Sequence, residues 1–220
     1  MFNDFQFPHA ESADKQGLVY IGGDLNSERV LSAYAQGIFP WYEPGSPVLW
    51  WSPNPRLVIY PDKFHLTRSL KKSLRDPSYR ITFDTAFSEV IQACASVDDR
   101  TGATWITPEM INTYTELFHQ GYGHSIEVWK EGRLIGGLYG LSLGRTFFGE
   151  SMFHLEPDAS KIALYTLCQW IKERDFDFVD CQLSSAHLLS LGGTLMKRKE
   201  YLHHLTQSLV HETILGPWEL

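Results

Sequence analysis

The sequence predicts a mixed α/β (α+β) protein, with a small N-terminal domain over residues 1–55 and a larger domain over residues 56–220. Within residues 56–220, segments with strand-like alternation and segments with helix-like apolar spacing follow one another. The first 55 residues are instead rich in glycine, proline and tryptophan. With 43% apolar residues, a chain of 220 residues can fill a substantial core.

The predicted N-terminal domain contains one helix near residues 27–36. Ser27 is placed to cap its start, and Gly37 is placed to end it. Prolines then fix turns in the segments 38–42 and 49–55, which together hold three tryptophans within eleven residues. These aromatic side chains can form a small core under the loops or offer flat faces for stacking.

The larger domain shows an ordered series of elements. A short strand over 57–60 is followed by helices over 65–74, 84–97 and 108–119, with Pro108 suited to the first turn of the third. Three antiparallel strands, a helix, a strand, a short helix and a last strand complete the order of an acetyltransferase-like (GNAT) domain. We expect these elements at residues 125–130, 134–141, 146–153, 158–174 (capped by Asp158), 176–182, 187–191 and around Tyr201.

Composition narrows the functional class. No apolar run approaches the ~20 residues that span a bilayer, and the start Met1–Asp4 has no basic segment leading into an apolar stretch. Three cysteines without a CxxC pair fit a reducing cytoplasm. The nine histidines follow no metal-ligand spacing. We therefore expect a cytoplasmic protein without a membrane segment, a signal peptide or a bound metal.

Charge is distributed unevenly along the chain. The net charge is −7, yet the segment from Arg56 to Arg80 has seven basic and two acidic residues, which gives it +5. Helical spacing places Arg68, Lys71 and Lys72 on one face together with Arg75. Such a patch can bind phosphates, or it can be a solvated helix face.

Two acidic residues interrupt apolar, strand-like segments: Glu150 lies within 147–153 and Asp180 within 176–182. Burying a carboxylate costs several kcal/mol unless a polar group meets it. The two acids can therefore share a cleft with a substrate, or each can form a buried ion pair with lysine or arginine. On a strand, Asp180 and Gln182 share one face and Cys181 points to the other, which predicts a core cysteine. A carboxylate can deprotonate an amine, and a carboxamide can hold one.

Several short motifs in order resemble the leucyl/phenylalanyl-tRNA–protein transferases, a family of bacterial enzymes. The similarity extends from about Phe7 to Tyr201, and the combination of motifs is far more specific than any one of them. The motifs are Gly22-Gly23-Asp24-Leu25, Gly37-Ile38-Phe39-Pro40-Trp41, Leu49-Trp50-Trp51-Ser52-Pro53, Thr104-Trp105-Ile106-Thr107, His124-Ser125-Ile126-Glu127-Val128-Trp129, Phe148-Gly149-Glu150-Ser151-Met152-Phe153, Asp180-Cys181-Gln182 and Ser190-Leu191-Gly192.

This resemblance implies a reaction. Such enzymes transfer leucine or phenylalanine, and less readily methionine, from aminoacyl-tRNA to proteins that begin with arginine or lysine. The product is marked for degradation by the N-end rule pathway. The family has a two-domain, GNAT-like fold and uses no cofactor. The turn 154–158 has no glycine to cradle the pyrophosphate of acetyl-CoA, which agrees with that implication. We expect a monomer.

The resemblance also implies roles for individual residues. Asp180 would orient the attacking amine and draw off its proton, partly through Gln182. Gln182 would hold the ester or the amine, and Glu150 would fix the acceptor. The sequence leaves open which group finally takes the proton, and the tRNA's own hydroxyl is one candidate. Trp41 and Trp105 would stack on the terminal adenosine, which is worth ~1–3 kcal/mol per base.

Two larger sets of residues would hold the rest of the aminoacyl-tRNA. The basic helix face would contact tRNA phosphates through Arg68, Lys71, Lys72 and Arg75. The transferred side chain would enter an apolar pocket formed by Leu138, Phe147, Leu164, Leu167, Ile171 and Val179.

Two alternatives predict other chemistry. An acetyl-CoA-dependent N-acetyltransferase could use the same fold, although the acidic turn Glu156-Pro157-Asp158 disfavours a pyrophosphate. A non-catalytic tRNA-binding module would explain the basic helix and the tryptophans, but it leaves Glu150 and Asp180 without a purpose.

Overall fold

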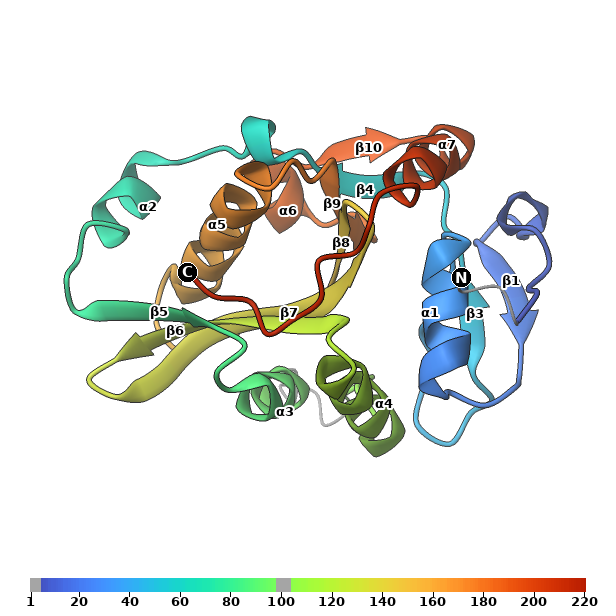
Figure 1. Cartoon of the computed structure of the whole chain (residues 1–220), viewed down its shortest axis with the longest axis horizontal. Helices are drawn as coiled ribbons and strands as arrows, with labels where there is room; N and C mark the ends of the chain where they lie inside the picture. The colour runs from blue at the N-terminus through green and yellow to red at the C-terminus, as the bar shows by residue number, and fades with distance from the viewer. Residues whose placement is uncertain (1–4, 98–103) are drawn as a thin grey trace.

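A computed structural model describes residues 5–97 and 104–220 of the chain. The segment Met1–Asp4, on which the argument about a signal peptide depends, lies outside these residues. The described part contains a three-stranded sheet near the N-terminus and a seven-stranded sheet formed by the rest of the chain (Figure 1). The predicted mixed α/β class and the acetyltransferase-like order of elements are confirmed.

The larger sheet has the strand order β10-β4-β9-β8-β7-β6-β5. All its neighbouring pairs are antiparallel except β8 and β9, which are parallel because helix α5 connects them across one face of the sheet. The strands, in chain order, are β4 (Arg56–Ile59), β5 (Tyr79–Phe83), β6 (Gly123–Lys130), β7 (Arg133–Leu143), β8 (Thr146–His154), β9 (Phe178–Gln182) and β10 (Thr194–Met196).

The parallel pair β8 and β9 separates before either strand ends. The two strands are paired over three positions only, the last of which sets Phe148 opposite Asp180. Beyond this point Gly149 and Glu150 continue β8, while β9 ends at Gln182. The strands therefore open into a gap in the middle of the sheet, with polar side chains at its edge.

Helices cover both faces of this sheet (Figure 1). Helix α5 (Ala159–Lys172) packs on one face, while α3 (Phe87–Val97) and α4 (Pro108–His119) pack on the other. The boundaries of α4 match the prediction, because the Thr107 side chain accepts from the Met110 amide at 3.2 Å and Pro108 occupies the first turn.

The N-terminal part packs against α4 rather than standing apart. Its sheet has the order β1-β3-β2, and helix α1 (Ser27–Ala35) shares one apolar cluster with the larger sheet through Tyr34, Tyr114 and Phe148. Asn26, not Ser27 as predicted, caps α1, because the Asn26 side chain accepts from the Arg29 amide at 2.8 Å. The three strands are β1 (Leu18–Ile21), β2 (Phe39–Pro40) and β3 (Leu49–Trp51).

Several predicted elements differ in the structure. Tyr201 lies in helix α7 (Arg198–Ser208), not in the last strand, and its fully buried ring packs against Phe178 and Arg56. Strand β5 was not predicted. Asp158 precedes α5 in a left-handed conformation without capping it, because its carboxylate instead accepts from Ser73 and pairs with Lys161.

The remaining helices are short, and α2 (Arg68–Ser73) and α6 (Ala186–Ser190) flank α5 (Figure 1). In the part of the chain that the structure describes, no helix combines the length and the apolar character needed to cross a membrane. Among the same residues, no three His, Cys, Asp or Glu side chains gather as ligands for a metal ion.

Candidate active site

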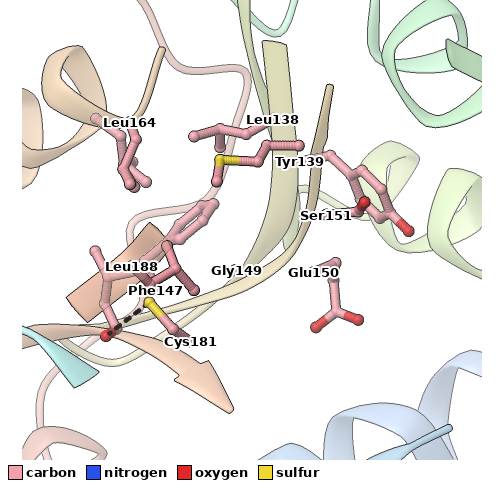
Figure 2. Close-up of a pocket in the computed structure, with 12 residues that line it drawn as sticks. Leu138, Tyr139, Phe147, Gly149, Glu150, Ser151, Leu164, Cys181 and Leu188 are labelled. Carbon is pink, nitrogen blue, oxygen red and sulfur yellow. Dashed lines mark hydrogen bonds between the residues drawn. The ribbon is translucent and has the colours of Figure 1, made fainter. Parts of the chain in front are cut away.

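An apolar pocket occupies the gap between β8 and β9, under helix α5 (Figure 2). Its volume is about 100 Å³. Five of the six side chains predicted to form a pocket line it: Leu138, Phe147, Leu164, Leu167 and Val179. Ile171 does not line it, because it lies one turn of α5 beyond Leu167 and is fully buried in the core behind. The other lining residues are Tyr139, Gly149, Glu150, Ser151, Met152, Cys181 and Leu188.

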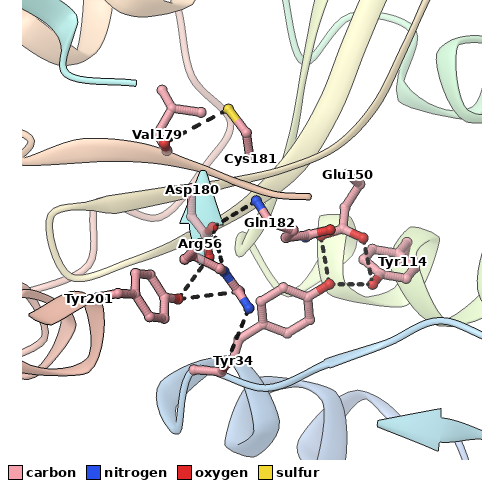
Figure 3. A network of polar contacts seen from close by, with 10 residues as sticks. Tyr34, Arg56, Tyr114, Glu150, Val179, Asp180, Cys181, Gln182 and Tyr201 are labelled. Atoms are coloured by element: carbon pink, nitrogen blue, oxygen red, sulfur yellow. Dashed lines mark hydrogen bonds and ion pairs between the residues drawn. The ribbon is translucent and has the colours of Figure 1, made fainter. Parts of the chain in front are cut away.

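Glu150 is the one carboxylate among the residues that line this pocket, and only 9% of the residue is exposed. Three neutral groups donate to it: the Tyr34 hydroxyl at 2.6 Å, the Tyr114 hydroxyl at 2.9 Å and the Gln182 amide nitrogen at 2.8 Å (Figure 3). Within residues 5–97 and 104–220, no lysine or arginine forms an ion pair with Glu150. Burial, opposed only by these donors, raises the pKa of Glu150 to about 7.

The two tyrosines and Glu150 form a triangle of oxygen contacts that is short of protons. The hydroxyl oxygens of Tyr34 and Tyr114 lie 2.7 Å apart, in addition to the contact that each makes with Glu150. Three contacts are thus served by two hydroxyl protons when Glu150 is ionised. A proton added to Glu150 completes the ring of hydrogen bonds, so the surroundings of this carboxylate favour uptake of a proton near neutral pH.

Asp180 has a contrasting environment. It is fully buried and forms a bidentate ion pair with Arg56, at 2.8 Å to Nε and 2.7 Å to Nη2. The Tyr201 hydroxyl and the backbone amide of Gln182 also donate to it, at 2.7 Å and 2.9 Å. The buried ion pair that the sequence left open as an alternative is therefore present at Asp180 and not at Glu150. Every acceptor direction of Asp180 is used inside the protein, and an incoming amine has no direct access to it.

Gln182 connects the two carboxylates. Its backbone amide donates to Asp180 and its side-chain amide donates to Glu150 (Figure 3). The residue has a φ of 61°, a left-handed conformation that is uncommon for residues other than glycine and that the two hydrogen bonds hold in place. Asp180 and Arg56 together thus fix the position of the Gln182 carboxamide.

Cys181 points away from Asp180 and Gln182, as the strand period predicts (Figure 3). It is partly exposed on the pocket wall rather than enclosed in the core. Although part of the residue is exposed, burial of its sulfur raises the pKa of the thiol well above the usual value, and the negative charge of Asp180 adds to the rise. Since the thiolate is the nucleophilic form, this environment disfavours a catalytic cysteine.

The predicted stacking residues Trp41 and Trp105 lie together. Both line a groove with Trp51 and Thr104, and Trp41 is 41% exposed. The Trp51 indole nitrogen donates to the Trp41 carbonyl at 2.6 Å, which fixes the backbone that presents the Trp41 ring. The structure thus brings two aromatic faces, 64 positions apart in the sequence, to one accessible groove.

The four predicted phosphate contacts are all exposed, but one of them has left the helix. Arg68, Lys71 and Lys72 belong to α2, whereas Arg75 lies two residues beyond its end at Ser73, and the predicted helix over 65–74 also ended before it. Arg56, which sequence counting assigned to the same basic segment, is fully buried under Asp180 and cannot contribute to the patch.

The turn before α5 carries two carboxylates held by lysines. Glu156 pairs with Lys130 at 2.7 Å and Asp158 pairs with Lys161 at 2.7 Å. A pyrophosphate at this helix start would meet both acidic side chains.

Comparison with known proteins places the chain in a family. The model for leucyl/phenylalanyl-tRNA protein transferase matches residues 58–206, and the model for the N-terminal domain of the same proteins matches residues 23–54. The chain belongs to the leucyl/phenylalanyl-tRNA protein transferase family. It is an enzyme, an aminoacyltransferase, as the resemblance in its motifs predicted.

Relatives named leucyl/phenylalanyl-tRNA–protein transferase are similar over almost their full length. One from Legionella pneumophila (strain Paris) is 56% identical over 99% of this chain and 98% of its own, and one from Maridesulfovibrio salexigens is 51% identical over 100% and 92%. Among solved structures, an aminoglycoside acetyltransferase from an uncultured soil metagenomic sample is 13% identical, with a TM-score of 0.41 over 66% of this chain and 97% of that one.

Four residues of this site were not singled out from the sequence: Tyr34, Arg56, Tyr114 and Tyr201. Arg56 offered a signal, because an arginine that begins an apolar strand implies a buried anion as its partner. The tyrosines offered none, since helical tyrosines with apolar neighbours are typical of an ordinary core.

Proposed function

We propose that the protein transfers leucine or phenylalanine, and less readily methionine, from aminoacyl-tRNA to the N-terminal arginine or lysine of acceptor proteins. The observation that carries this proposal is a buried carboxylate among the residues that line an apolar pocket. Burial raises the pKa of this carboxylate, Glu150, to about 7, and a fixed carboxamide donates to it. Such a group can take the proton of an attacking amine, and such a pocket can hold an apolar side chain beside it.

The aminoacyl side chain would enter the pocket between Leu138, Phe147 and Leu167, with its ester at the mouth near Glu150. The walls come from three strands and two helices. A β-branched side chain would place a methyl group against the walls near the mouth. One misplaced methyl is worth ~1–3 kcal/mol, which supports a preference for unbranched or γ-branched side chains.

Glu150 is assigned to receive the proton of the acceptor's α-amine. The amine nitrogen attacks the ester carbon, the amide bond forms and the bond to the ribose oxygen breaks. The proton taken by Glu150 can then be returned to that ribose oxygen, which leaves as a hydroxyl. Tyr34 and Tyr114 support this cycle, because their hydroxyls form a complete ring with Glu150 only when it is protonated.

Asp180 is assigned to act through Gln182 rather than on the amine itself. The ion pair with Arg56 holds Asp180 in place, and Asp180 in turn holds the backbone of Gln182. The Gln182 carboxamide is then positioned to contact the ester or the amine. In this assignment Glu150 is the carboxylate that meets the cationic N-terminus of the acceptor.

The rest of the aminoacyl-tRNA would contact two surfaces outside the pocket. The groove between Trp41 and Trp105 suits the terminal adenine, since stacking needs no particular base sequence. The exposed bases of α2 suit backbone phosphates. Reversing Lys71 and Lys72 to glutamate should weaken tRNA binding and reduce its salt slope by about one for each lysine, and a slope that stays the same would remove α2 from the contact.

The natural consequence of the reaction is a protein with a new leucine or phenylalanine at its N-terminus. We propose that this residue marks the acceptor for degradation by the N-end rule pathway, and that the enzyme acts as a monomer in the cytoplasm. Elution of the purified protein as a dimer in size-exclusion chromatography would contradict the proposed monomeric state.

The decisive experiment mixes the enzyme with phenylalanyl-tRNA carrying labelled phenylalanine and a peptide that begins with arginine. We expect labelled peptide, and none from a matched peptide that begins with glutamate. Label that stays on the tRNA while the tRNA binds would indicate a binding module instead. Titration with acetyl-CoA in a calorimeter tests the acetyltransferase alternative, for which we expect no heat of binding because of the acidic turn before α5.

A further inference from the structure

The C-terminal segment after α7 crosses the sheet beside β7 and ends near α5 (Figure 1). Hydrogen bonds tie it to three loops of the larger domain. The Gly144 amide donates to Thr213 at 2.9 Å, the Gly216 amide donates to the Gly121 carbonyl at 2.9 Å, and the Trp218 amide donates to Asp84 at 2.6 Å. The sequence showed no pattern in this segment, yet the structure fixes it in place.

Trp218 carries the segment into the core. It is 2% exposed and lies in a stack of rings, 3.6 Å from the His124 centroid on one side and 4.0 Å from the Trp170 centroid on the other. Its indole nitrogen donates to the Ile214 carbonyl at 3.0 Å, so the ring has a single orientation. Trp170 donates in turn to the Glu219 carbonyl at 2.7 Å, which closes the arrangement.

Trp218 also touches a wall of the candidate active site. Its ring lies 5.9 Å from the ring of Phe147, which is fully buried and lines the apolar pocket (Figure 2). On another side Phe147 meets the backbone at Gly140, where a side-chain carbon would come within 2.7 Å of its ring. Phe147 is thus confined between Gly140 and Trp218, and the position of this pocket wall depends on the C-terminal segment.

We propose that Trp218 is a specificity-determining residue, which sets the depth of the aminoacyl pocket by holding Phe147 in place. This inference rests on the proposed function. An apolar cavity of about 150 Å³ admits benzene, whereas this pocket has a volume of about 100 Å³. While Trp218 holds the Phe147 ring against the pocket, the pocket favours leucine over phenylalanine. Without the Trp218 ring, the Phe147 ring can move into the space that Trp218 occupied. The pocket then becomes deeper, and transfer of phenylalanine increases relative to transfer of leucine.

The test compares kcat/KM for leucyl-tRNA and phenylalanyl-tRNA in the wild type and in Trp218→Ala, with one arginine peptide as acceptor. We expect the ratio of phenylalanyl to leucyl transfer to rise about 10-fold in the variant. Leu220→Ala is the matched control, because Leu220 lies two residues away in the same segment and is 75% exposed. A merely structural role would lower both rates in proportion, and an unchanged ratio would overturn the proposal.

Trp218→Phe keeps the test decisive if the alanine variant does not fold. It retains a ring beside Phe147 but a smaller one, so we expect a rise of about threefold in the same direction, between wild type and Trp218→Ala. A thermal melt of each variant reports folding separately from specificity. If the wild type transfers neither residue, the proposed function fails; if it transfers both and no Trp218 variant changes their ratio, only this inference fails.

Discussion

The two buried carboxylates of the site lie on neighbouring strands and share Gln182, yet their surroundings differ in kind. Asp180 has a guanidinium partner, whereas Glu150 has three neutral donors and a pocket beside it. A guanidinium partner holds a buried carboxylate in a fixed ion pair, while neutral donors leave it able to take a proton. Of two acids on neighbouring strands, one can thus support the structure, as Asp180 does, while the other is placed to react, as Glu150 is.

The largest effect should come from removing the counterion. Arg56→Met leaves Asp180 buried without a positive partner, so we expect the free energy of unfolding to fall by about 3–5 kcal/mol in a urea titration. Arg68→Met is the control, because Arg68 is exposed on α2 and its loss should change stability by less than about 0.5 kcal/mol. Equal losses of stability in the two variants would show that Arg56 is not needed as the buried counterion of Asp180.

The next test measures how the ionisation of Glu150 makes the free energy of unfolding depend on pH. The pKa of Glu150 is raised from 4.5 to about 7 in the folded protein. Its protonated form is therefore favoured by folding, and that contribution is fully present below pH 4.5 and lost as pH rises through 7.

The Glu150→Gln side chain cannot ionise. The difference in the free energy of unfolding between the wild type and this variant therefore isolates the contribution of Glu150 ionisation. Relative to the variant, the free energy of unfolding of the wild type should fall by on the order of 3 kcal/mol between pH 4.5 and pH 8. A difference that stays constant across this range, or that rises with pH, would show that Glu150 is ionised as readily in the folded chain as in the unfolded one.

The same variant tests catalysis. Glu150→Gln keeps the shape of the side chain and its bonds to the tyrosines, but it cannot take a proton. We expect transfer to the arginine peptide to slow about 100-fold or more, equivalent to about 3 kcal/mol, while tRNA binding in a filter assay stays unchanged. Transfer at the wild-type rate would assign proton removal to another group.

The smallest effect should come from removing one of the hydroxyl groups that donate to Glu150. Tyr114→Phe removes a hydroxyl that lowers the pKa of Glu150, so the pH at which transfer is half-maximal should rise by about one unit, equivalent to about 1.4 kcal/mol. Tyr139→Phe is the matched control: its buried hydroxyl has no hydrogen-bond partner within the described residues, and the midpoint should not move. A shift of the same size in both variants would indicate a general packing effect.

Much of the fold could be predicted because its signals are local. Helix α4 was predicted with its correct ends from Pro108 in its first turn and from Gly121 and Gly123, which follow its end, and β6 to β8 were predicted from alternation and glycine turns. Strand β5 was missed although its five residues, Tyr79–Phe83, alternate between apolar and polar side chains and so carried a strand signal. Tyr201 was assigned to a strand because its partners, Asp180 and Arg56, lie more than twenty and more than one hundred positions away, respectively.

By itself, the order of the residues determined the fold class and the family, because these depend on periodicity and on motifs written in short segments. The resemblance to that family then indicated five of the residues that line the pocket. Only the tertiary structure decided the charges. Whether a buried carboxylate is neutralised depends on which side chain another strand brings within 3 Å of it, as β4 brings Arg56 to Asp180 and α1 and α4 bring hydroxyls to Glu150. The same is true of Trp218, whose role follows from the rings that the fold gathers around it rather than from its neighbours in the chain.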